Sequence, residues 1–69
     1  MTKLDAGNFK IQIETTNDAF YPSPRLEIMG ILRLIVREID EGNSAGLCID
    51  SNGNCVGSWI YTEAETLGG

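Results

Sequence analysis

The pair Asn52-Gly53 most constrains the fold of this chain, because it lies between two short β-prone segments. These segments are GLCID (residues 46–50) and CVGSWIY (residues 55–61). A two-residue type I′ turn needs positive φ at both of its positions, and Asn-Gly adopts this geometry more easily than most dipeptides. The sequence therefore predicts a β-hairpin with Asn52 and Gly53 at its tip.

The position of the turn fixes the register of this hairpin. Counting back from the tip, Ile49 faces Val56 and Cys48 faces Gly57. One face, which we expect to be buried, then carries Leu47, Ile49, Val56 and Ile60. The opposite, open face carries Cys48, Asp50, Cys55, Trp59 and Tyr61.

A strand is predicted before the hairpin at residues 9–14, where apolar and polar side chains alternate in the segment FKIQIE. Its apolar face carries Phe9, Ile11 and Ile13. A loop rich in turn-forming residues follows at residues 15–24, and Phe20 and Tyr21 are expected to pin it to the domain.

An amphipathic helix is predicted over residues 25–41. Apolar residues at spacings of four, three and four stack on one helical face, which we expect to be core: Ile28, Leu32, Ile35 and Ile39. Ser23 can cap the first backbone N–H groups, and Pro24 suits the first helical position. Gly42 and Asn43 favour the end of the helix.

The helix contains more apolar residues than one buried face needs. Leu26, Met29 and Leu34 fall away from the core side of the helical wheel. One interpretation is that a sheet edge or the loop at residues 15–24 covers them. The other is a dimer or partner surface around Leu26, Gly30 and Leu34.

These elements predict a single small α+β domain over residues 1–69 with the order β-α-β-β. We expect a three-stranded antiparallel sheet with one helix packed across one face, an ordered core over residues 8–62 and a flexible acidic tail at residues 63–69. The expected core residues are Phe9, Ile11, Ile13, Ile28, Leu32, Ile35, Ile39, Leu47, Ile49, Val56 and Ile60.

Charge and hydropathy narrow the possible partners. The chain has 69 residues, of which ten are acidic and five basic, and no histidine, so its net charge is −5. This charge repels a nucleic acid backbone and suits a basic protein surface. No apolar run approaches the roughly 20 residues of a membrane span, and the N-terminal segment does not have the apolar core of a signal peptide. We therefore expect a cytoplasmic protein with no direct nucleic acid or membrane partner.

The two cysteines do not define a metal site or a clear disulfide. Cys48 and Cys55 lie diagonally in the predicted hairpin, so a bridge is possible, but free thiols are favoured in a reducing cytosol. A zinc site would need more ligands than two cysteines without histidine supply. The segment DSNGN resembles the start of a calcium loop, yet Cys55 and Tyr61 stand where a glycine and a bidentate glutamate belong. We expect no metal and no cofactor.

Catalytic residues are not expected either, because the chain has no histidine base and neither cysteine has an activating neighbour in sequence. Paired acids occur as Asp40 with Glu41 and as Glu63 with Glu65, but such pairs are more often solvated charge.

The C-terminal Leu67-Gly68-Gly69 resembles the tail of ubiquitin-like modifiers and sulfur carriers, which would imply a carrier function. The β-grasp domain of those families opens with a hairpin, whereas this chain places one strand before its helix.

Three segments resemble a group of small proteins that phages and prophage-like elements often encode. They are an I-x-I-x-T strand at residues 11–15, an N-x-A-F loop at residues 17–20 and a D-x-N-G-N-x-V-G hairpin at residues 50–57. The group has no established common function, and the resemblance implies no catalytic residues.

The resemblance implies an accessory protein in a bacterial host cell that binds and occludes a nucleic-acid-handling complex, as anti-CRISPR inhibitors do. The acidic residues that would face a basic surface are Asp40, Glu41, Asp50, Glu63 and Glu65. Trp59 and Tyr61, on the open face of the predicted sheet, are further candidates for partner binding. The alternative function is a self-associating structural or virion-associated domain.

Overall fold

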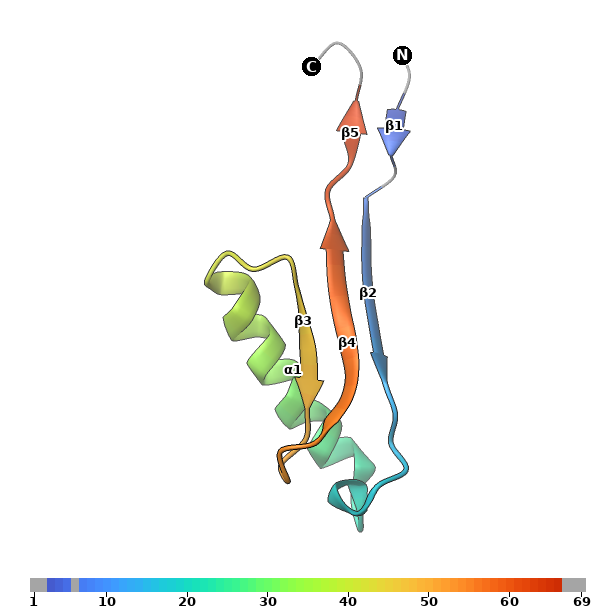
Figure 1. The fold of residues 1–69 in the computed structure, drawn as a ribbon, viewed down its shortest axis with the longest axis vertical. Helices are drawn as coiled ribbons and strands as arrows, with labels where there is room; N and C mark the ends of the chain where they lie inside the picture. Colours follow the sequence, from blue (N-terminus) through green and yellow to red (C-terminus); the bar gives the residue numbers. More distant parts are fainter. Residues whose placement is uncertain (1–2, 6, 67–69) are drawn as a thin grey trace.

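A three-stranded antiparallel sheet lies at the centre of the structure, and one helix packs across one of its faces (Figure 1). The computed structural model describes residues 3–5 and 7–66. The strand order is β2-β4-β3. The bounds of these elements are β2 Asn8–Ile13, α1 Pro24–Asp40, β3 Ala45–Ile49 and β4 Cys55–Thr62. The predicted α+β fold, with its three-stranded antiparallel sheet and single helix, is confirmed.

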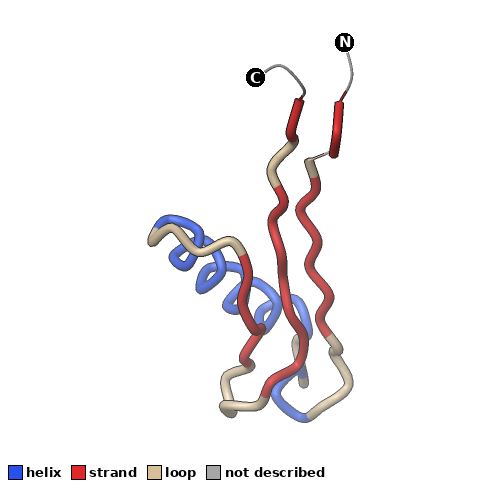
Figure 2. The backbone as a smooth tube through the Cα atoms, turned by 45° about the horizontal axis from the view of Figure 1, so that its top comes forward, coloured by secondary structure: helices blue, strands red, loops and turns tan. Residues whose placement is uncertain are grey.

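Two short strands lengthen the molecule beyond the helix. β1 (Lys3–Asp5) and β5 (Glu65–Thr66) pair antiparallel and continue the ribbon of β2 and β4 (Figure 1, Figure 2). The radius of gyration is 15.1 Å, against roughly 11 Å for a compact chain of this length. The sequence places residues 63–69 in a flexible tail, whereas the structure pairs β5 within that segment. Residues 67–69 lie outside the described residues.

The ends of α1 follow from local sequence. Pro24 occupies the first turn, as predicted, but the Ser23 side chain makes no capping hydrogen bond. At the other end Gly42 adopts a φ of +99°, which favours glycine. Its N–H donates to the Ile39 carbonyl at 3.0 Å, and the N–H of the next residue donates to the Glu38 carbonyl at 3.0 Å. This pair of bonds is a Schellman motif, and it ends the helix.

The hairpin forms as predicted, but its tip is a three-residue loop. The Gly53 N–H donates to the Asp50 carbonyl at 3.0 Å, and the Asp50 N–H donates to the Asn54 carbonyl at 2.9 Å. Gly53 has a φ of +85°, whereas no other residue of the loop has positive φ. The prediction of a type I′ turn at Asn52-Gly53 is therefore wrong. A loop with glycine at its last position is the next most common hairpin connection.

The change at the tip is accompanied by a β-bulge. Cys48 pairs with Gly57, as predicted, but Ile49 pairs with Cys55 instead of Val56. Val56 is thus an extra residue in β4, and it joins the buried face beside Gly57.

Gly57 is required where β4 passes β2. A Cβ atom at this position would overlap the backbone carbonyl of Gln12 and lie 3.0 Å from the Ile13 Cα. The absence of a side chain at Gly57 lets the backbones of β2 and β4 approach closely at this point.

The hairpin face that packs against the helix is the opposite of the predicted one. Among the described side chains, the buried apolar residues are Phe20, Ile31, Ile35, Cys48, Val56 and Trp59. Leu47 and Ile60, which the sequence predicts in the core, are instead 60% and 49% exposed. Alternation along a strand defines two faces without indicating which is covered, and burying the indole of Trp59 removes more apolar surface from water than burying Ile60.

The helix is rotated relative to its predicted orientation. Ile31 and Ile35 are buried and Ile28 is partly buried, but Leu32 and Ile39 are exposed. Of the remaining predicted core residues, Ile11 and Ile13 pack against the core, Ile49 is half-buried and Phe9 is exposed.

Candidate functional site

Asp50, a predicted partner-binding residue, is buried in a hydrogen-bonded cluster at the hairpin tip. Its side chain is 5% exposed. Asp50 Oδ1 accepts hydrogen bonds from the backbone N–H groups of Asn52 at 2.9 Å and Asn54 at 2.8 Å. Asp50 Oδ2 accepts a bond from the Asn17 side-chain amide at 2.7 Å. Asp50 is therefore not available to a partner.

Burial opposes ionisation of the Asp50 carboxyl, but the N–H donors of Asn54, Asn17 and Asn52 outweigh this effect. The pKa of Asp50 is consequently below its ordinary value. The carboxylate stays charged at neutral pH and is bound by internal donors, so it is a structural anchor of the loop.

The same cluster joins two of the three sequence patterns, the N-x-A-F loop at residues 17–20 and the D-x-N-G-N-x-V-G hairpin at residues 50–57. Asn17 Oδ1 accepts the Ala19 N–H at 3.0 Å, which caps the short 3₁₀ helix η1 (Asp18–Phe20). From the first turn of α1, the Glu27 carboxylate accepts the Ser51 hydroxyl at 3.0 Å. The N-x-A-F loop and the D-x-N-G-N hairpin thus hold one end of the fold together.

Trp59, predicted on the open face, is instead buried between the sheet and α1. The side chain is 2% exposed, and its indole N–H donates to Glu38 Oε1 at 2.9 Å. Its ring centroid lies 5.9 Å from that of Phe9. A Cβ at Gly46 would lie 2.7 Å from both hydrogen-bonding atoms, so the glycine provides the space for this contact. Trp59 therefore cannot contribute to an exposed partner surface.

The two cysteines are free thiols, as the sequence favours, but they do not share a face. Cys48 is buried and Cys55 is exposed. Burial raises the pKa of the Cys48 thiol, and the nearby Cys55 and Glu38 raise it further. A protonated, buried thiol is a poor nucleophile. Within the described part of the chain, no group of three or more His, Cys, Asp or Glu residues could hold a metal ion.

An exposed apolar stripe runs along α1. Four side chains recur at spacings of three, four and three on one flank of the helix: Met29, Leu32, Val36 and Ile39. Val36 is the most exposed of them, at 64%. Phe9 and Tyr61, which are cross-strand neighbours, extend this surface over the sheet. We call these six residues the open apolar face.

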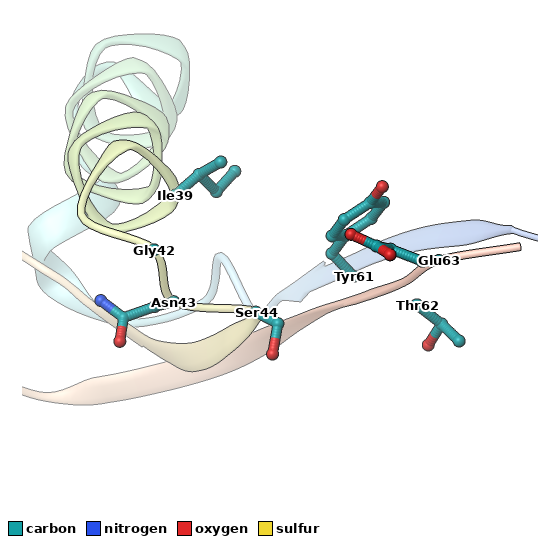
Figure 3. A pocket seen from close by; sticks show the side chains of 7 residues that line it. All are labelled: Ile39, Gly42, Asn43, Ser44, Tyr61, Thr62 and Glu63. Atoms are coloured by element: carbon teal, nitrogen blue, oxygen red, sulfur yellow. The ribbon is translucent and has the colours of Figure 1, made fainter.

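The stripe and the sheet meet at a shallow hollow near the end of α1. Figure 3 shows Ile39 projecting from the helix and Tyr61 from β4 on the two sides of this hollow. Its lining residues are Ile39, Gly42, Asn43, Ser44, Tyr61, Thr62 and Glu63. The apolar face therefore begins at a concave surface.

Some of the predicted acidic residues lie at or near this hollow. Glu63 lines it, and the exposed Asp40 and Glu41 stand directly between Ile39 and Gly42 in the chain. The side chain of Glu65 lies outside the described part of the structure. The structure thus brings three of the five predicted acidic residues to one end of the domain.

The predicted surface around Leu26, Gly30 and Leu34 lies on the other flank of α1. Leu26 and Leu34 are exposed, while Gly30 is half-buried. Gly30 and Leu34 border a second small hollow that is also lined by Glu27, Ile31, Ile49, Asp50 and Ser51. Polar groups of the Asp50 cluster interrupt this flank, so its exposed apolar residues are less continuous than those of the open apolar face.

Comparisons with known proteins give no independent indication of function. No protein-family model matches this chain, and no curated protein or solved structure is significantly similar to it. Among the described helices, none has the length and hydropathy needed to cross a membrane. The functional interpretation therefore depends on the side chains described above.

Proposed function

We propose that this protein is a non-enzymatic protein-binding module whose contact surface is the open apolar face. The observation that carries this proposal is the exposure of four regularly spaced apolar side chains on α1 beside Phe9 and Tyr61. Contiguous apolar surface is costly to leave in water, and on a folded domain it commonly marks a contact with another protein.

The chemistry of the described side chains supports binding over catalysis. The Asp50 carboxylate is bound by internal donors, and the Cys48 thiol is buried with a raised pKa. The carrier alternative depends on Leu67, Gly68 and Gly69, which lie outside the described residues.

The acidic end supports a narrower form of the proposal. Glu63 lines the hollow at one end of the apolar face, Asp40 and Glu41 lie in the chain between its lining residues Ile39 and Gly42, and the chain has a net charge of −5. Such a surface suits a partner with an apolar ridge flanked by Lys and Arg. The corresponding role is that of an anti-CRISPR-like accessory protein that occludes the basic surface of a host nucleic-acid-handling complex.

Partner capture with matched helix variants tests the proposed function. Val36→Glu places a charge in the open apolar face, and Leu34→Glu places the same charge on the opposite flank of α1. We expect Val36→Glu to abolish recovery of partners from a bacterial extract and Leu34→Glu to retain it. Equal recovery by both variants would show that the contact surface lies elsewhere.

Salt and charge reversal test the narrower form. A partner held by the acidic end should be released as ionic strength rises, because surface charge pairs are screened. Glu63→Lys should weaken the same complex at low salt. If neither higher ionic strength nor Glu63→Lys weakens the complex, the acidic end is not part of the binding surface.

A further inference from the structure

We infer that the open apolar face binds a second copy of this chain, with the two α1 helices packed antiparallel. This inference rests on the broad form of the proposed function, a protein-binding surface at this face, and it names a second copy in place of the host partner of the narrower form. Three features support a second copy: the spacing of the stripe, the charges at its two ends and its continuity with the core.

The spacing of the stripe is self-complementary. Met29, Leu32, Val36 and Ile39 repeat at the three-four-three spacing of a helix seam. These positions are symmetric about residue 34, so an antiparallel pair places Met29 of one copy opposite Ile39 of the other. Leu32 then lies opposite Val36. A two-fold axis at the centre of the seam gives the same contacts to both copies, and the interface closes as a dimer.

The charges at the ends of the stripe favour the antiparallel direction. Arg25 lies in the first turn of α1, where the positive end of the helix dipole disfavours a cation. Asp40 and Glu41 lie at the other end, where an anion is disfavoured. All three side chains are exposed. An antiparallel second copy brings Arg25 toward Asp40 of its neighbour, and it places each of these two charges beside a helix end of opposite sign.

The apolar seam also continues a small core. Ile28, Ile31 and Ile35 pack inward, and they form the row of α1 residues next to the stripe. A second helix laid along the stripe covers Leu32 and Ile39, which a lone domain leaves exposed. Burial of apolar surface would then extend from the sheet across α1 to the second copy.

Sedimentation equilibrium of the full chain over a range of concentrations tests the dimer and its location. We expect the wild type to dimerise, and the dimer to persist at high salt because its seam is apolar. Val36→Glu should weaken dimerisation by more than about a hundredfold, since it buries two unpaired charges at the seam. Leu34→Glu, on the opposite flank, should dimerise like the wild type, and circular dichroism should show both variants folded.

A charge swap tests the direction of packing. Arg25→Glu should weaken the dimer roughly tenfold, because it places like charges together at both ends of the seam. The double variant Arg25→Glu with Asp40→Lys should restore dimerisation. Arg25→Glu places an anion at the N-terminal end of α1, and Asp40→Lys places a cation at its C-terminal end, so both changes are favourable to the helix dipole. A weaker dimer in the single variant therefore does not arise from a less stable fold.

The outcomes separate this inference from the proposed function. A wild type that stays monomeric overturns the inference, while the protein-binding function stands if Val36→Glu still abolishes partner capture. A dimer that Val36→Glu leaves intact overturns the assignment to this face. A dimer that the double variant fails to restore overturns the antiparallel arrangement.

Discussion

At the hairpin end of the molecule, polar groups are bound by other groups of the same chain, whereas at the C-terminal end of α1, apolar groups remain open to solvent. Asn17, Asp50 and Asn54 form one hydrogen-bonded cluster, and Glu27 ties the helix to the same loop. No buried side-chain nitrogen or oxygen in the described residues is without a partner. A closed polar cluster fixes geometry but leaves little for a partner to bind, so the open end is the better candidate for function.

The contrast also explains why the motif residues do not mark the binding surface. Asn17 comes from the N-x-A-F loop and Asp50 from the D-x-N-G-N-x-V-G hairpin, and both side chains hold the fold together. The residues of the open apolar face lie outside those segments. Residues of a sequence pattern can thus fix a fold without marking its binding surface.

The largest loss of stability should come from removing a large buried side chain from the core. Phe20 is fully buried, and Phe20→Ala should lower the free energy of unfolding by about 3–5 kcal/mol. Chemical denaturation measures this loss. A change below about 1 kcal/mol would mean that the loop carrying Phe20 does not contribute to the core.

A smaller loss is expected where the helix meets the sheet. Trp59→Phe should cost about 1–3 kcal/mol, because it leaves Glu38 without the indole donor in a partly buried position. Glu38→Gln keeps an oxygen acceptor, so thermal unfolding should show a smaller effect for that variant. Equal effects would indicate that the carboxylate charge contributes as much to the contact as the indole donor does.

The closed end should make stability depend on pH. The pKa of Asp50 is lower in the folded chain than in the unfolded chain, so its contribution is fully present above the unfolded value. That contribution is lost as pH falls through the unfolded pKa, which is about 4, and then through the folded pKa. Asp50→Asn should be less stable than the wild type at neutral pH and should converge with it in acid. Parallel pH profiles of the two proteins would contradict the structural role of this carboxylate.

The smallest effect on folding should come from the open end. Val36 is mostly exposed, so Val36→Ser should change the free energy of unfolding of the monomer by no more than about 0.5 kcal/mol. Denaturation at high dilution isolates this value from self-association. A large loss would show that Val36 is already covered within one copy.

Much of the fold could be predicted because its signals are local. Gly42 identifies the end of the helix, Asn52-Gly53 places the hairpin, and the alternation of FKIQIE gives a strand. None of these signals specifies which side of an element meets its neighbours. The indole contact with Glu38 holds the Trp59 face of the sheet against the helix, and it joins α1 to β4 across a separation of 21 residues.

The helix illustrates the same limit in the candidate site. The predicted core row Ile28, Leu32, Ile35 and Ile39 takes two residues from the buried side and two from the open apolar face. A helix with two adjacent apolar rows has more than one reasonable orientation on a helical wheel. Glu38 continues the buried row of Ile31 and Ile35. Because Glu38 is charged, the apolar pattern alone does not indicate that the buried row extends to this position.

Trp59 is the single tryptophan of the chain, and it lies where β4, β3 and α1 meet. Its fluorescence therefore reports the docking of helix to sheet and not the state of one strand. Undocking of α1 would release the indole from Glu38 and expose it to water, which shifts the emission to longer wavelength. The native sequence thus carries its own optical probe of this docking.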